Sequence, residues 1–244
     1  MYTIDAKGLD YRRLNSRIRE AVSSGETRLS LSNVNGHRYI ACGFKGPLKI
    51  ELIGTGGNDL GAYMSGPEIT VKGNVQDCAG NTMNAGSILV EGRAGDILGY
   101  GMSGGEILIQ GDVGSRAGVH IKAWEGQGPV LIIGGTAGDF LGEYMAGGTI
   151  IVLGLDSDAP AVGRQCGVGM YGGSIFVNAR KFPGNAGKGV VVSLPDDEDR
   201  ALIAGYVARF AEYFGHDATA IMKEGFVKLA PQARRPYGSM YVGA

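Results

Sequence analysis

The sequence predicts an all-β protein, a single-stranded, right-handed parallel β-helix with coils of 19 residues and short helical caps at both ends. Three observations lead to this prediction. A 19-residue unit recurs through the middle of the chain, and each unit contains two aliphatic residues separated by one position. Glycine occupies 44 of 244 positions, well above the usual share of about 7%. Repeats of this length without helical periodicity are typical of a solenoid.

The repeat is read most easily from a methionine-like position. Its members recur at intervals of 19, 19, 19, 24 and 25 residues: Met64, Met83, Met102, Ile121, Met145 and Met170. Three residues before each of them stands a glycine: Gly61, Gly80, Gly99, Gly118, Gly142 and Gly167. We refer to these six glycines as the glycine framework, and we expect the methionine row to be part of the core rather than a ligand set. A second set of glycines brackets the expected strands and is expected to form the corners: Gly73, Gly92, Gly111, Gly135 and Gly154.

The aliphatic pairs predict one short strand in each coil. They stand five and seven residues after each anchor, as in Ile69/Val71, Ile88/Val90 and Ile107/Ile109. Side chains alternate between the faces of a strand, so both members point the same way, and stacked coils line them up inside the solenoid. The general preference of parallel crossovers favours a right-handed path.

Three segments follow from this pattern: an N-terminal helix and strand cap (1–47), the β-helix (48–193), and C-terminal helices with an extended tail (194–244). A helix is expected over residues 10–24, and strands on either side of an Asn35-Gly36 turn. Two further helices are expected at 197–214 and 218–223. Open solenoid ends expose unpaired strands, so these flanking helices are expected to cap them.

Two insertions and the tail are the candidate partner interface. One insertion, 122–127, carries the single tryptophan, Trp124, and the other covers 155–162. The tail contains Arg234, Arg235 and Tyr237. Insertions in a solenoid often bind partners, although a tolerated surface loop is the alternative for each.

Composition excludes several classes of function. The formal net charge is −1, so no basic face indicates nucleic acid. No apolar run approaches the roughly 20 residues of a membrane span, and the N-terminus has no signal-peptide core. Three cysteines without pairing motifs are typical of a reducing cytoplasm. Whether the chain forms a homo-oligomer stays open.

The search for reactive or metal-binding groups yields no catalytic residue and no metal site. The cysteines lack C-x-x-C spacing, and His37 and Cys42 form only a loose pair. Cys78 and Cys166 fall in repeat positions that other coils fill with apolar residues, so both are interpreted as core. Asp77, Asp96 and Asp139 recur at one coil position. Calcium binding is the alternative there, but turn formation fits their spacing better.

The repeat resembles the GXGXG β-helix domain. The segments that carry the resemblance are GDILGYGMSGGEILIQG (95–111) and GDFLGEYMAGGTIIVLG (138–154). That domain closes the large chain of glutamate synthase and also forms one of the chains of formylmethanofuran dehydrogenase. The flanks NGHRYIACGFKG (35–46), QDCAGNTMNAG (76–86) and RRPYG (234–238) are more similar to the free-standing glutamate synthase version.

The resemblance implies a structural subunit of a glutamate-synthase-like oxidoreductase complex, working in nitrogen metabolism. Its partners would be an amidotransferase subunit and a synthase subunit that carries FMN and an iron–sulfur cluster. No cofactor is expected on this chain, and only the glycine framework is carried over from the family. Three alternatives remain: the β-helix subunit of a formylmethanofuran dehydrogenase, an N-methylglutamate synthase subunit, and a self-contained enzyme using a Cys–His pair.

Overall fold

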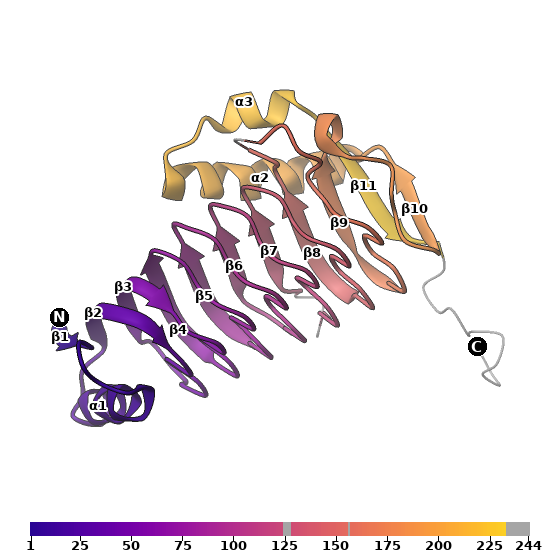
Figure 1. Ribbon diagram of the computed structural model, residues 1–244. Helices are drawn as coiled ribbons and strands as arrows, with labels where there is room; N and C mark the ends of the chain where they lie inside the picture. The colour runs from indigo at the N-terminus through magenta and orange to yellow at the C-terminus, as the bar shows by residue number, and fades with distance from the viewer. Residues whose placement is uncertain (124–127, 156, 233–244) are drawn as a thin grey trace, which may run out of the picture.

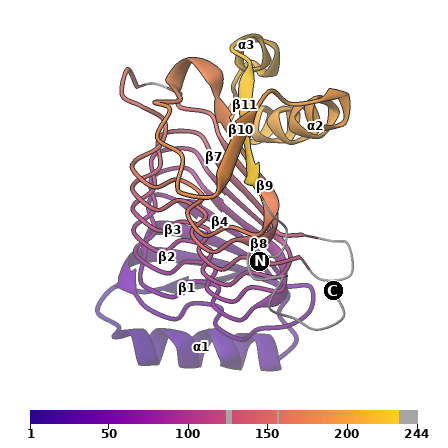
Figure 2. The same ribbon diagram turned by 90° about the vertical axis from the view of Figure 1, so that its right-hand side faces the viewer.

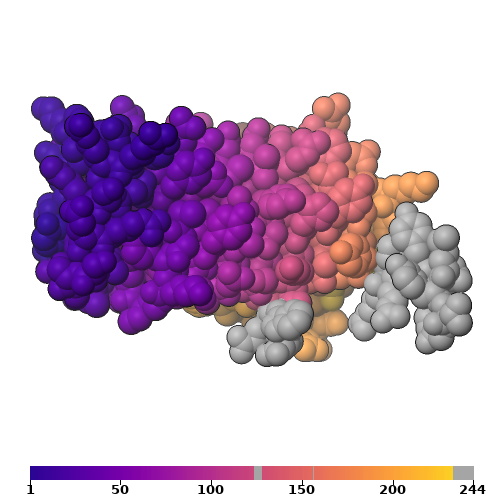
Figure 3. Space-filling model, turned by 90° about the horizontal axis from the view of Figure 1, so that it is seen from below, coloured from indigo at the N-terminus to yellow at the C-terminus, as the bar shows by residue number. Residues whose placement is uncertain are grey.

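A single long sheet forms the body of the molecule in the computed structural model, which describes residues 1–123, 128–155 and 157–232. The coils follow one another along one axis from the N-terminal to the C-terminal end (Figures 1 and 3). The elements in chain order are β1 (Tyr2–Asp5), α1 (Tyr11–Ser23), β2 (Arg28–His37), β3 (Lys49–Gly56), β4 (Ser65–Lys72), β5 (Ala85–Val90), β6 (Glu106–Ile109), β7 (Val130–Ile133), β8 (Ala146–Val152), β9 (Gly172–Asn178), the short helix η1 (Ala179–Lys181), β10 (Val190–Ser193), α2 (Asp197–Phe214), α3 (Ala218–Lys223) and β11 (Phe226–Pro231).

The strands β1 to β9 pair in parallel with their sequence neighbours, which confirms the parallel β-solenoid. Register is kept from coil to coil, so two aliphatic rows run through the interior. The first row is Ile50, Ile69, Ile88, Ile107, Leu131, Ile150 and Ile175, and the second is Leu52, Val71, Val90, Ile109, Ile133, Val152 and Val177. All of these side chains are buried, and so are all six members of the methionine row. The prediction that both sets form the core is confirmed.

The N-terminal end contributes two more strands to the same sheet. Leu29 and Leu31 of β2 pair with Ile50 and Leu52, so the parallel stack begins before residue 48. The expected turn at Asn35-Gly36 is wrong, because β2 runs through both residues and absorbs them as register shifts. Helix α1, capped by the Asp10 side chain, covers this end of the stack (Figure 2).

The C-terminal end differs from the expected helical cap. Strand β11 pairs antiparallel with β9, and β10 pairs antiparallel with β11. The segment 226–231, expected to be irregular, is therefore a strand that covers the last parallel coil.

Helix α2 packs on the outer face of the sheet and lies across several coils (Figure 1). Its apolar side includes Ile203, Val207 and Phe210, all buried. They pack on a set of outward-facing strand residues: Leu89, Leu108, Val130, Ile132, Ile151 and Phe176. Two ion pairs attach the helix to the sheet. Asp199 in its first turn pairs with Lys228 of β11 at 2.7 Å, and Arg209 in its second half pairs with Glu106 of β6. The C-terminal coils are thus buried on both faces of the sheet.

Candidate functional site

The framework glycines lie at the centre of one corner of each coil. In a representative coil, Asp59, Gly61 and Tyr63 have φ values of 60°, 67° and 58°, so left-handed residues occupy alternate positions. The Gly61 N–H donates to Ile40 O of the preceding coil at 2.8 Å, and the Tyr63 N–H donates to Asn81 O of the next coil at 2.8 Å. The corner therefore bonds the coil to both of its neighbours.

Packing explains why the central position of this corner is glycine. A Cβ at Gly80 would lie 2.3 Å from Ile107 Cδ1, and one at Gly118 would lie 2.6 Å from Ile150 Cδ1. Real Cβ atoms do not approach other atoms this closely, and a φ near +65° disfavours any residue with a Cβ. The framework is a structural device, and its outer positions carry the variable side chains.

At and beside those outer positions, aromatic rings meet on the surface. Tyr100 and His120 meet edge to face, with ring centroids 5.7 Å apart. His120 stacks on Tyr144 at 5.4 Å with an interplanar angle of 12°. We call these three residues the aromatic ladder. Tyr100 is 40% and Tyr144 49% exposed, so the ladder is available for contact. The sequence did not reveal this ladder because its members are not spaced by the 19-residue repeat. Tyr100 and His120 are 20 residues apart, and His120 and Tyr144 are 24 apart.

The recurring acids accept hydrogen bonds from backbone N–H groups. The Oδ1 atoms of Asp77, Asp96 and Asp139 accept hydrogen bonds from the N–H groups of Asp96, Ser115 and Arg164 at 2.9, 2.8 and 2.7 Å. Each acid thus ties its coil to the next, 19 or 25 residues further along the chain, and not to its own turn as the turn-forming interpretation expected. In the described part of the chain, no three His, Cys, Asp or Glu side chains gather where they could hold a metal ion.

The thiols show no activated nucleophile. Burial raises the pKa of the Cys166 thiol to about 12, and burial is also the main cause of the raised pKa of Cys42 and of Cys78. Cys166 is a core residue as expected. The same interpretation is wrong for Cys78, which is half-buried at an outer left-handed position with φ 62°. Both ring nitrogens of His37 contact backbone, at Asn35 N and Leu9 O.

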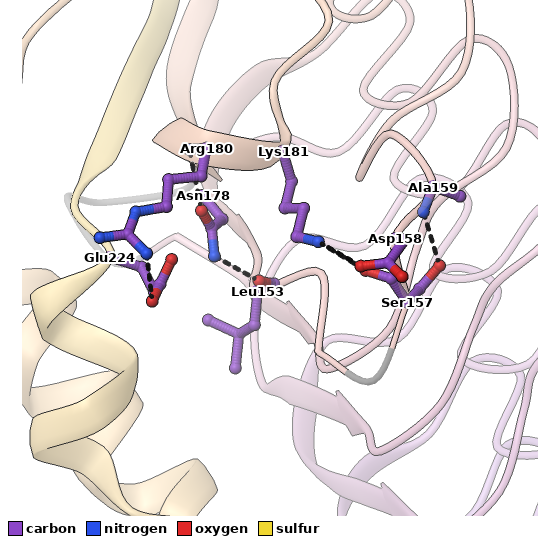
Figure 4. Close-up of polar contacts among 8 residues, drawn as sticks. All are labelled: Leu153, Ser157, Asp158, Ala159, Asn178, Arg180, Lys181 and Glu224. Carbon is purple, nitrogen blue, oxygen red and sulfur yellow. Dashed lines mark hydrogen bonds and ion pairs between the residues drawn. The ribbon is translucent and has the colours of Figure 1, made fainter.

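A pocket of about 700 Å³ lies between η1, α3 and the loop after β8. Figure 4 shows several of its polar side chains. Arg180 pairs with Glu224 at 3.1 Å, and Lys181 donates to Ser157 O at 2.8 Å and lies 3.5 Å from Asp158. His216 Nε2 is buried here without a hydrogen-bond partner among the described residues. Among the described residues of the lining, both Arg180 and Lys181 are thus already paired within the protein.

The expected interface residues fall outside the described part of the chain. Trp124, Arg234, Arg235 and Tyr237 belong to 124–127 and 233–244. No helix in the remaining ranges has the length and apolar character needed to cross a membrane.

Comparison with known proteins agrees with this architecture. The family model described as GXGXG motif matches residues 13–232, the β-helix family that includes the C-terminal domain of glutamate synthase. An uncharacterized protein of Methanocaldococcus jannaschii is 40% identical over 248 residues, covering 98% of this chain and 95% of that relative. The chain belongs to the GXGXG family.

Proposed function

We propose that this chain is a non-catalytic β-helix subunit of a cytoplasmic glutamate-synthase-like complex. It would hold an amidotransferase subunit and an FMN- and iron–sulfur-containing synthase subunit in register, so that ammonia passes between their sites. The observation that carries the proposal is the family match over residues 13–232. FMN and the cluster are expected on the synthase subunit and not on this chain.

The chemistry of the described residues supports a scaffolding role. The recurring acids are used as backbone acceptors between coils. Burial is the main cause of the raised pKa of all three thiols, whereas a nucleophilic cysteine needs a lowered pKa. A stack in which each coil bonds both neighbours is a stiff frame, which suits holding two partners at a fixed separation.

The aromatic ladder is the surface on which we expect a partner subunit to dock. Exposed tyrosines supply large contact areas at low entropic cost and are enriched at the centres of interfaces. Tyr100, His120 and Tyr144 come from three successive coils, so together they form a continuous strip. Trp124 follows His120 closely in the sequence and remains part of this proposed interface, together with Arg234, Arg235 and Tyr237 of the tail.

Affinity purification of the tagged chain from its native host, with mass spectrometry and a visible spectrum, tests the proposal. Recovery of an amidotransferase subunit and a yellow-brown flavoprotein would support it. A molybdenum or tungsten enzyme would instead support the formylmethanofuran dehydrogenase branch, and a synthase partner whose product is N-methylglutamate would support the N-methylglutamate branch. A colourless chain without partners would contradict the scaffold role.

A matched pair of variants tests the docking surface. The double variant Tyr100→Ser, Tyr144→Ser removes two exposed rings of the ladder and should reduce partner recovery at least tenfold. Tyr213→Ser removes a ring of similar exposure, 55%, from α2 and should leave recovery unchanged. Equal recovery with both variants would exclude the ladder as the docking surface.

A further inference from the structure

The two ends of the sheet differ in what covers them. At the N-terminal end, α1 lies over the first coils with Leu14, Ile18 and Ala21 buried. At the C-terminal end, the strand order closes with β10 beyond β11, and no third strand or helix among the described residues pairs with the outer edge of β10. Figures 1 and 2 show β10 at the extremity of the molecule.

The outer edge of β10 carries exposed apolar side chains. Val191, Val192 and Leu194 are 46%, 43% and 78% exposed. Natural proteins protect exposed edges with lysine, proline, a bulge or a covering element, because an unpaired edge recruits other strands. Between Val190 and Leu194 the chain has no charge, no proline and no bulge. The strand is short and Pro195 follows it, but its central residues leave an apolar edge open to pairing.

The hydrogen-bond pattern identifies which groups face outward. The Ala179 N–H donates to Gly225 O, and the Gln232 N–H donates to Gly189 O. In an antiparallel ladder the bonding residues alternate, so Val227 and Leu229 bond toward β9, whereas Lys228 and Ala230 bond toward β10. Their partners on β10 are Ser193 and Val191. The backbone groups of Val192 and Leu194, and the carbonyl of Val190, consequently point to the open edge.

We propose that a second copy of this chain covers this edge by antiparallel pairing of β10 with β10 about a twofold axis at Val192. A twofold interface must be self-complementary, and this edge meets that requirement. Val192 would exchange both hydrogen bonds with its counterpart. The Leu194 N–H of each copy would donate to Val190 O of the other. Valine would lie against valine at the axis and against leucine on either side.

Charge supports this register and this occupant. The chain has an exposed lysine, Lys188, before β10 and an exposed aspartate, Asp196, after it. Pairing symmetric about Val192 places Lys188 of each copy opposite Asp196 of the other. The same symmetry pairs Val192 with its counterpart, Val190 with Leu194 and the opposite charges with one another, and it places Val191 opposite Ser193.

Light scattering coupled to size exclusion tests the proposal on the full chain. We expect a mass of about twice 25.4 kDa in the micromolar range. Val192→Lys and Val192→Glu each place like charges together at the axis and should give monomers. An equimolar mixture of the two variants should recover the doubled mass, because the axis then joins lysine to glutamate. Recovery in the mixture shows that both variants remain folded.

A control variant outside β10 tests whether loss of the doubled mass is specific to the β10 edge. Leu202→Lys changes an apolar residue of similar exposure, 41%, on α2, and should keep the doubled mass. A full chain that is monomeric throughout the micromolar range would overturn the proposal. A doubled mass that survives both Val192→Lys and Val192→Glu would overturn it as well, since the contact would then lie elsewhere.

Discussion

At Gly118, both the backbone conformation and the packing disfavour a Cβ atom. Its φ is +69°, and an added Cβ would lie 2.6 Å from Ile150 Cδ1. The left-handed conformation costs a residue with a Cβ about 1–2 kcal/mol, and overpacking costs about 1–3 kcal/mol. Gly118→Ala should therefore lower the free energy of unfolding by about 2–5 kcal/mol in urea denaturation.

Gly205 is the control for this substitution. It lies in α2 with no neighbouring atom within 4 Å of an added Cβ, and alanine is favoured over glycine in a helix by about 1 kcal/mol. Gly205→Ala should stabilise the protein. If both variants changed the urea midpoint in the same direction, the steric account of the framework would be refuted.

Thiol reactivity is a second prediction at this scale. Because burial raises the pKa of Cys166 to about 12 and also raises the pKa of Cys42 and of Cys78, little thiolate exists at pH 8 in the folded state. In a native titration with a disulfide reagent, Cys166 should not react and the other two should react slowly, whereas all three should react in denaturant. A rapidly reacting thiol in the native protein would contradict this prediction and support the alternative of a self-contained enzyme that uses a Cys–His pair.

The same shift sets a direction for alkaline stability. The folded Cys166 pKa lies above its ordinary value of 9.0, so only the unfolded thiol ionises as the pH rises from about 9 toward 12. The unfolded state then binds fewer protons, and the contribution of Cys166 to stability falls through that window. Cys166→Val should lose stability less steeply there than the natural protein, as measured by thermal melts at successive pH values.

Phe210 is a central contact between helix α2 and the sheet. Phe210 is fully buried, and its Cζ lies 2.6 Å from where a Cβ on Gly134 would stand, so the ring fills a gap that the glycine leaves. Phe210→Ala removes most of that contact and should cost about 3–5 kcal/mol. Amide exchange across 197–214 should rise in this variant. Leu202→Ala, at a site 41% exposed, should change stability by less than about 0.5 kcal/mol.

The position of α2 shows which elements the repeat could predict. The inward rows could be predicted because Ile-x-Val alternation specifies one face of a strand. The middle residue of each triplet carried a second signal: it is Glu51 and Thr70 in early coils, and Leu108, Ile132 and Ile151 in later ones. That change marks where the outer face of the sheet becomes buried. The helix that buries it, α2, lies far along the chain, so the repeat alone could not identify it. The antiparallel β11 had no repeat to reveal it, since its neighbours are set by tertiary contacts.

At the scale of the whole molecule, the two halves of the solenoid differ in how much they bury. The outer face of β3 and β4 carries ion pairs such as Lys49–Glu68 at 2.7 Å, and half-exposed pairs of this kind contribute about 0–1 kcal/mol. The outer face of β6 to β9 is sealed by α2 and α3. Opening an early coil therefore exposes one apolar face, whereas opening a late coil exposes two.

This difference predicts an order of local opening. In a solenoid each coil contacts only its neighbours, so stability is nearly a sum over coils, and amide exchange reports the opening of each unit. Under native conditions β3 and β4 should exchange faster than β6 to β9. Phe210→Ala removes an outer-face contact from the late coils alone, so it should narrow the difference in amide exchange rate between β3–β4 and β6–β9. Leu202→Ala should leave that difference unchanged. A difference that persists unchanged in Phe210→Ala would mean that the coils themselves, and not the covering helix, set the order.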